Sequence, residues 1–165
     1  MAKIPIKSRD KLAPEDQKIY DKIASSRGKA LNLFKVLLNS PKAAENIGSL
    51  GAYLRYDSVL PPNIREITIL TVARALNVAY EWAHHEPIAR EVGVSDKSIE
   101  IIHSGRAPSG MIAKDGVFTK ATKELLVDGS MEASTFQAVE HLVGRDGVVD
   151  FVVLVGYYAM LGGIL

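Results

Sequence analysis

The fold is decided by one stretch of the sequence, residues 60–102, which reads LPPNIREITILTVARALNVAYEWAHHEPIAREVGVSDKSIEII. Its apolar residues recur at helical spacing, and they predict three consecutive helices at about 61–76, 78–91 and 96–103. The Pro61-Pro62 pair is a start signal for the first helix, and Gly93 ends the second. Ser95 is the predicted N-cap of the third helix.

The sequence on both sides of this stretch also has helical spacing. Before it, helices are predicted at 14–26, 29–38 and 41–57. After it, we expect a loop rich in glycine, proline and serine at 104–116, then helices at 118–127, 134–143 and 147–162. The run from Val148 to Val155 is β-branched, but it continues into YYAMLGGIL and is too long for one strand.

The predicted fold class is therefore all-α. The length of 165 residues fits one domain with its own core. We predict a single helical domain over 1–165, with N-terminal helices at 1–58, a motif core at 60–104 and C-terminal helices at 117–165.

The composition excludes several functional classes. Hydrophobic residues make up 47% and charged residues 24%, as in soluble globular proteins, and the formal net charge of +1 gives no general attraction to nucleic acid or to membranes. Cysteine is absent, which removes disulfides and thiol redox chemistry. The first residues contain no signal-peptide run, and the apolar stretch from Val148 to Leu165 is too interrupted for a membrane span. We expect a cytoplasmic protein.

Two acids and a histidine fall on the apolar faces of the predicted helices. Glu66 lies within the apolar arc of its helix, where a carboxylate is costly unless it is paired or protonated. His85 lies on the apolar stripe of the next helix, one turn after Glu81. Pro87 should bend this helix and free the carbonyl of Ala83. Such a cluster suits acid–base chemistry, and it also suits a buried structural pair.

A metal site is the alternative use of these residues. Glu81 with His84, and Glu100 with His103, form two E-x-x-H pairs of the kind found in di-iron helical bundles. In two antiparallel helices these pairs would be offset by about 10 Å, which is too far for one di-metal centre. We therefore predict no metal and no cofactor.

These residues resemble the carboxymuconolactone decarboxylase-like superfamily, whose other branch is the alkyl hydroperoxide reductase D type. The resemblance is carried by residues 60–102, with Glu66 early in one helix, His85 in the next, Ala89 four positions later and a Gly-Val-Ser turn at 93–95. The segments LAPEDQKIYDKI and GVVDFVVLVGYYAMLGGIL also resemble members without cysteines. The resemblance implies an alkyl hydroperoxide reductase D-like helical bundle that assembles as homotrimers or homohexamers.

The resemblance also separates the two branches. The peroxidase branch places C-x-x-C before the histidine, and those two positions are Val78 and Glu81 here, so this thiol peroxidase mechanism is excluded. A glutamate four residues before His85 is more similar to the decarboxylase branch. That branch converts γ-carboxymuconolactone, an unsaturated lactone acid, by loss of carbon dioxide and proton transfer.

We therefore expect a cofactor-free lyase that acts on a small carboxylated or lactone-type substrate. His85, Glu66 and Glu81 are the predicted catalytic residues. The predicted substrate-binding residues are Trp82 as a pocket wall, Arg74 as a charge stabiliser and Tyr157 from the last helix. Three other arginines could hold a substrate carboxylate instead, namely Arg55, Arg65 and Arg90.

The alternative is a non-catalytic or ligand-binding helical oligomer that has lost the peroxidase chemistry, with Glu66 and His85 as a buried pair. Broad apolar arcs on nearly every helix also predict a homo-oligomer.

Overall fold

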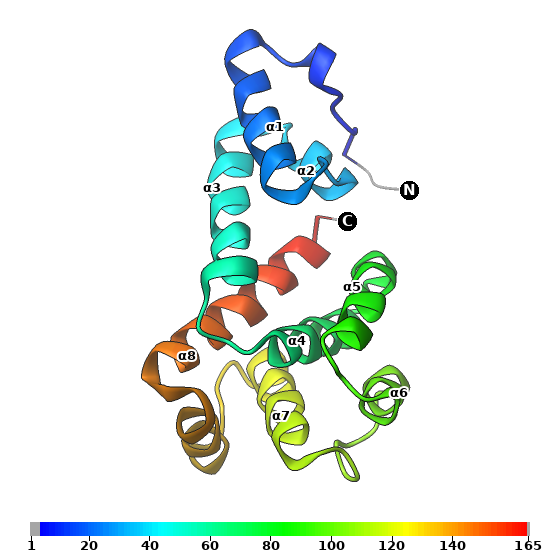
Figure 1. Ribbon diagram of the computed structural model, residues 1–165, viewed down its shortest axis with the longest axis vertical. Coiled ribbons are helices and arrows are strands. Elements are labelled where there is room, and N and C mark those ends of the chain that lie inside the picture. Colours follow the sequence, from blue (N-terminus) through cyan, green and yellow to red (C-terminus); the bar gives the residue numbers. More distant parts are fainter. Residues whose placement is uncertain (1–3, 165) are drawn as a thin grey trace. The chain divides into compact units, whose positions relative to one another are not determined.

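The structure is a computed structural model that describes residues 4–164, apart from the side chains of Ser26 and Arg27. Every regular element within these residues is a helix, which confirms the all-α prediction (Figure 1). The described residues divide into two compact units, residues 4–57 with Gly163 and Ile164, and residues 58–162. No helix within 4–164 has both the length and the apolarity to cross a bilayer.

The first unit is built from the N-terminal helices. Its elements are a short 3₁₀ helix η1 (Arg9–Lys11), α1 (Pro14–Arg27), α2 (Asn32–Leu37), α3 (Pro41–Ala52) and a π-helical segment η2 (Tyr53–Asp57). Proline occupies the first position of α1 and of α3, where its missing N–H costs nothing. Helix α3 packs against α1 and α2, and a Cβ added at Gly48 would lie only 3.1 Å from Ile23 Cγ1. The helices therefore approach closely at this glycine.

The second unit surrounds one central helix, α4. Its elements are α4 (Pro62–Ala75), α5 (Ala79–Glu91), α6 (Asp96–Ser104), α7 (Ala113–Val127) and α8 (Ala133–Gly162). Helix α4 packs against all four of the others, and nine of its residues are buried. Because α4 is covered on several sides, three of its polar side chains, Glu66, Thr68 and Thr71, also lie inside. Thr68 and Thr71 donate to the carbonyls of Ile64 and Ile67, one turn earlier, which satisfies their hydroxyls.

The helix boundaries differ from the sequence prediction in three places. Helix α2 is shorter than the predicted 29–38, and the predicted helix 41–57 changes to a π-helical segment at Tyr53. Helix α7 begins at Ala113, five residues before the predicted start at 118. Gly116 favours a loop by propensity, but it lies inside this helix where a Cβ would be 3.6 Å from the carbonyl oxygen of Pro108. Gly116 therefore does not end the helix, and a side chain at this position would make only an ordinary van der Waals contact with Pro108.

Helix α8 contains one non-helical residue. Gly144 has φ 72° and ψ 175°, so the helix is divided at this point. The sequence predicted two helices here with a turn at 144–147, and the structure confirms the division but reduces the turn to one residue. Glycine suits this position because a side chain would strain a backbone with positive φ.

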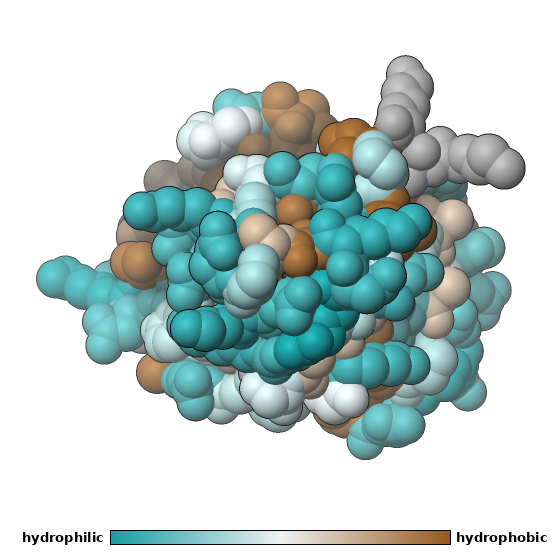
Figure 2. Space-filling view, turned by 90° about the horizontal axis from the view of Figure 1, so that it is seen from above, coloured by the Kyte–Doolittle hydropathy of each residue, from teal (hydrophilic) through white to brown (hydrophobic). Residues whose placement is uncertain are grey.

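The surface seen in Figure 2 is mostly hydrophilic, with hydrophobic residues in small separate areas. This view shows one face only. The exposed large apolar side chains of the described residues include Val149 and Val152 on α8.

Candidate active site

The candidate site is formed by α4 and α5 in the second unit. Glu66 lies on α4, and only 4% of its surface is exposed. On α5, Glu81, His85 and Ala89 are the buried residues, spaced four apart on one face of the helix. The apolar packing of α4 and α5 thus carries two carboxylates and an imidazole into the interior.

The imidazole of His85 lies between the two carboxylates. Its Nδ1 is 2.7 Å from Glu66 Oε2, and its Nε2 is 3.5 Å from Glu81 Oε2. His85 is 1% exposed and Glu81 is 4% exposed, so water does not screen these contacts strongly. Both ring nitrogens therefore face a carboxylate oxygen, with the tighter contact at Nδ1. This arrangement can hold the ring in one orientation.

An aromatic ring from α8 completes the surroundings of His85. The ring of Tyr158 lies 5.2 Å from the imidazole, edge to face at 89°. Tyr157, the residue predicted from the sequence, lies against Tyr158 with the ring centres 5.4 Å apart. Both tyrosines are buried. The sequence analysis named Tyr157, whereas the ring that contacts the histidine is that of its neighbour Tyr158.

Pro87 does not act on the cluster as expected. Helix α5 continues through it to Glu91. Pro87 and Ala83 are both exposed, two residues on either side of the buried His85 and so on the opposite face of the helix. The hydrogen bond that the proline removes is therefore lost on the solvent side, where water can replace it.

Trp82 and Arg74 lie outside the acid–imidazole cluster. They line a hollow of about 340 Å³ together with Asn77, Val78, Ala79 and His103, and His85 is not among its lining residues. The indole Nε1 of Trp82 donates to Glu86 Oε2 at 3.1 Å, and the Trp82 ring lies 5.0 Å from that of His103. The predicted residues therefore fall into two groups. Glu66, Glu81 and His85 form an acid–imidazole cluster, and Tyr157 contacts Tyr158, whose ring lies against His85. Arg74 and Trp82 line a separate hollow.

The E-x-x-H pairs do not converge. Glu81 contacts His85, whereas His103 contacts the ring of Trp82. Within residues 4–164 no group of three or more histidine, aspartate or glutamate side chains is arranged to hold a metal ion.

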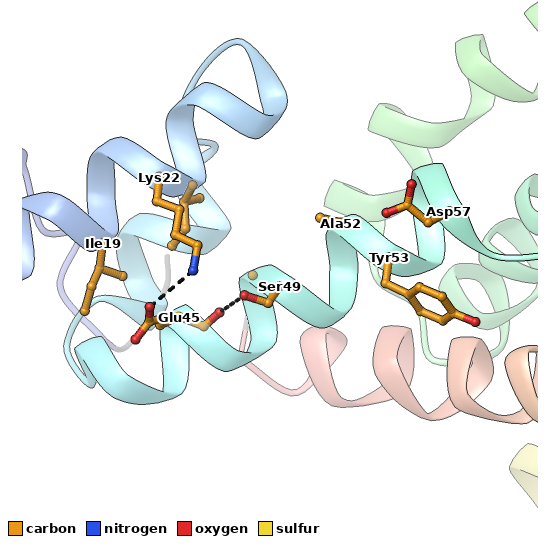
Figure 3. A pocket seen from close by; sticks show the side chains of 9 residues that line it. Ile19, Lys22, Glu45, Ser49, Ala52, Tyr53 and Asp57 are labelled. Carbon is orange, nitrogen blue, oxygen red and sulfur yellow. Dashed lines mark hydrogen bonds and ion pairs between the residues drawn. The ribbon is translucent and has the colours of Figure 1, made fainter.

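A further pocket lies within the first unit, between α1 and α3 (Figure 3). It has a volume of about 250 Å³, and Ile19 and Ile23 form part of its wall. Lys22 Nζ is 3.3 Å from Glu45 Oε1, and Ser49 donates to the Glu45 carbonyl at 2.9 Å. None of the residues predicted to form the active site lines this pocket.

The second unit thus combines an all-α core with a glutamate on one helix and a histidine on the next. The chain belongs to the carboxymuconolactone decarboxylase family, because the family model matches residues 41–124, about half of the chain. The matched region contains Glu66, Glu81 and His85, and it confirms the resemblance noted at residues 60–102. A comparison with curated proteins gives no match.

Proposed function

We propose that this protein is a cofactor-free acid–base enzyme of the carboxymuconolactone decarboxylase family, a lyase acting on a small carboxylated or lactone-type substrate. The observation that carries the proposal is the position of His85 between Glu66 and Glu81, with all three side chains buried. Buried titratable groups in direct contact are the usual means by which enzymes prepare a general acid or base. Membership of the family supports the same reading.

In the proposed reaction His85 transfers the proton. Glu66 holds Nδ1 at 2.7 Å, so Nε2, whose contact to Glu81 is longer at 3.5 Å, is the nitrogen that would exchange its contact for one with substrate. The carbon–carbon bond to the substrate carboxylate breaks, carbon dioxide leaves, and the electron pair passes into the conjugated system. Protonated His85 then gives its Nε2 proton to the carbon of the conjugated system on which the electron pair ends, and it takes another proton from solvent. Glu81 would act as a second acid or as a substrate contact.

Substrate has to reach a nearly closed site. Because His85 is 1% exposed, binding must displace side chains that cover the imidazole, and Tyr158 is one of them. Tyr157 would act by supporting the Tyr158 ring. Arg74 and Trp82 are left out of this site because the hollow that they line does not include His85.

The test uses γ-carboxymuconolactone in deuterated water with the purified full chain. We expect release of carbon dioxide and one deuterium on the product carbon. His85→Gln should lower kcat by about 100-fold or more, because general acid–base catalysis contributes that much. His141→Gln, an exposed histidine on α8, is the matched control and should turn over like the wild type. Equal turnover by His85→Gln would remove His85 from the mechanism.

The burial of the cluster also favours a second function. A non-catalytic, ligand-binding oligomer would retain Glu66 and His85 as a structural pair, and such a pair needs no access to solvent. Absence of turnover by the wild type on γ-carboxymuconolactone and on related lactone acids, together with a folded chain, would favour this alternative.

A homotrimeric or homohexameric assembly and a cytoplasmic location are parts of the same proposal. Support for assembly comes from α8, on which Val149, Val152, Gly156 and Met160 are exposed. These positions are three or four residues apart and so form one apolar stripe along the helix. We refer to these four residues as the α8 stripe.

A further inference from the structure

The rings of Trp82 and His103 separate two hollows of opposite charge. On one side lies the hollow of about 340 Å³ whose charged residue is Arg74, and no carboxylate lines it. On the other side lies a hollow of about 230 Å³ that Glu86, Asp96 and Glu100 line together with Arg90. The first hollow therefore favours an anion.

Arg74 is held in place by a backbone carbonyl. Its Nε donates to the carbonyl of His103 at 2.6 Å, at the C-terminal end of α6. Among the described residues no carboxylate pairs with Arg74. Gly105 lies beside the guanidinium, and a Cβ there would be 3.5 Å from Nη2, an ordinary van der Waals contact. The remaining N–H groups of Arg74 are thus available to a ligand.

A second cation lies close to Arg74. Lys123 Nζ donates to the carbonyls of Gly105 and Arg106, at 3.2 and 2.7 Å. Burial, and in addition the positive charge of Arg74, lower the pKa of Lys123. An anion bound at Arg74 would relieve this repulsion between like charges.

Besides Arg74, the hollow is lined by the polar residues Asn77 and His103 and by an apolar part. Ala73, Val78 and Ala79 line it beside the indole of Trp82. The indole N–H is already bound to Glu86, whose pKa is lowered by the hydrogen bond from Arg90, against burial, with a further contribution from Trp82. Glu86 therefore stays ionised at neutral pH and continues to accept the hydrogen bond from the indole N–H. The part of Trp82 that faces the hollow is its ring carbons.

We propose that this hollow is a binding site for a small planar carboxylate, aromatic or unsaturated, whose carboxylate pairs with Arg74 and whose ring lies against Trp82. An arginine fork matches a carboxylate in geometry and charge, and an indole face matches a flat apolar ring. The volume suits a molecule with one ring. The inference rests on the hollow and not on the reaction proposed for His85.

The experiment is a fluorescence titration of the full chain with benzoate, which has no lactone to react. Trp82 is the chain's single tryptophan and lines this hollow, so its emission reports binding there, and the Arg74 variant separates that signal from binding in the acidic hollow that Trp82 also lines. We expect a saturable change with benzoate and none with benzamide, the neutral counterpart. Arg74→Gln should weaken binding by about tenfold or more, since a charge-assisted contact is lost. Arg145→Gln, an exposed cation paired with Glu140 on α8, is the matched control and should bind like the wild type.

A second variant keeps the test decisive if Arg74→Gln does not fold, which circular dichroism would reveal. Ala79→Met retains Arg74 but fills the hollow from an exposed position at the start of α5, and it should abolish the saturable change. A signal that rises in proportion to benzoate and is equal in wild type and variants would be collisional quenching. That result, or equal affinity for benzoate and benzamide, would overturn the proposal.

Discussion

At the scale of single residues, Glu66 and His85 depend on each other for their burial. A carboxylate taken out of water loses hydration that only a close partner can replace, and the 2.7 Å contact with His85 Nδ1 is that partner. The pair would therefore be strongly coupled in folding, whether or not it also takes part in catalysis.

A double-mutant cycle with Glu66→Leu and His85→Leu measures this coupling. Each single variant leaves a buried polar group without its partner, and we expect a loss of about 3 kcal/mol in the free energy of unfolding. The double variant should lose less than the sum, by about 1–3 kcal/mol. Urea unfolding at neutral pH gives all four values.

The control cycle uses Glu140→Leu and Arg145→Leu, an ion pair in which Arg145 is 91% exposed. Its coupling should be below about 1 kcal/mol because water screens the pair. Additive losses for Glu66 and His85 would show that the two groups do not stabilise each other.

The acid–imidazole cluster could be predicted from the sequence, but the position of Trp82 could not. Glu66 and His85 are polar residues inside apolar arcs, and such an arc is readable in one helix at a time. Trp82 shares the stripe of His85 only loosely, because three residues turn a helix by about 300° and leave the two side chains roughly 60° apart. Its ring contacts His103, and nothing in the spacing of α5 reports a partner on α6.

At the scale of elements, a carboxylate from another helix caps the N-terminus of α8. Glu124 of α7 accepts from the backbone N–H of Glu132 at 3.0 Å and from the hydroxyl of Thr135 at 3.0 Å, and Lys120 Nζ lies 3.2 Å away. Free N–H groups at a helix start need such acceptors. A cap from a distant helix leaves no local sequence signal, unlike the cap that Ser95 provides for α6.

The cap should make stability depend on pH. Burial raises the pKa of Glu124, but the hydrogen bonds from Glu132, Lys120 and Thr135 outweigh it and hold the pKa below its ordinary value of 4.5. A lowered pKa in the folded state stabilises the fold above the unfolded value, and this stability is lost as the pH falls through the folded pKa.

Glu124→Gln tests this dependence. At neutral pH the free energy of unfolding of the variant should be about 1–2 kcal/mol lower than that of the wild type, because a charged acceptor is lost. The gap should begin to close as the pH falls below 4.5, where the carboxyl of the unfolded chain takes up a proton, and should vanish below the lower pKa of the folded state, where the wild-type carboxyl is protonated too. Urea unfolding across that range provides the measurement, with Glu140→Gln expected within about 0.5 kcal/mol of wild type. A gap that is constant with pH would show that the charge of Glu124 does not support the cap.

At the scale of the whole molecule, the family match at 41–124 includes residues of both compact units. The sequence predicted the helices of each unit through apolar spacing, which acts locally. The division into units depends on contacts between helices far apart in the chain, so spacing could not reveal it. The same limit applies to assembly, which depends on surfaces and not on the pattern within one helix.

The α8 stripe is the surface from which we predict assembly. Val149 is 61% exposed and Val152 is 40% exposed, and they lie on one face of α8 with Gly156 and Met160. A row of exposed apolar side chains costs free energy in water, and a second copy of the chain can cover it. We therefore expect wild-type protein to sediment as a trimer or hexamer of the 17.9 kDa chain.

The double variant Val149→Glu/Val152→Glu should sediment near 17.9 kDa while keeping its helical circular dichroism, because two carboxylates per chain would have to be buried in the interface. Val127→Glu is the matched control, since Val127 is 81% exposed at the end of α7 and lies outside the α8 stripe. This control should assemble like the wild type.

Sedimentation of the wild type at the mass of one chain would rule out assembly. An unchanged oligomer in the double variant would place the interface on another face, because no assembly could retain the α8 stripe at its centre with four added charges or more.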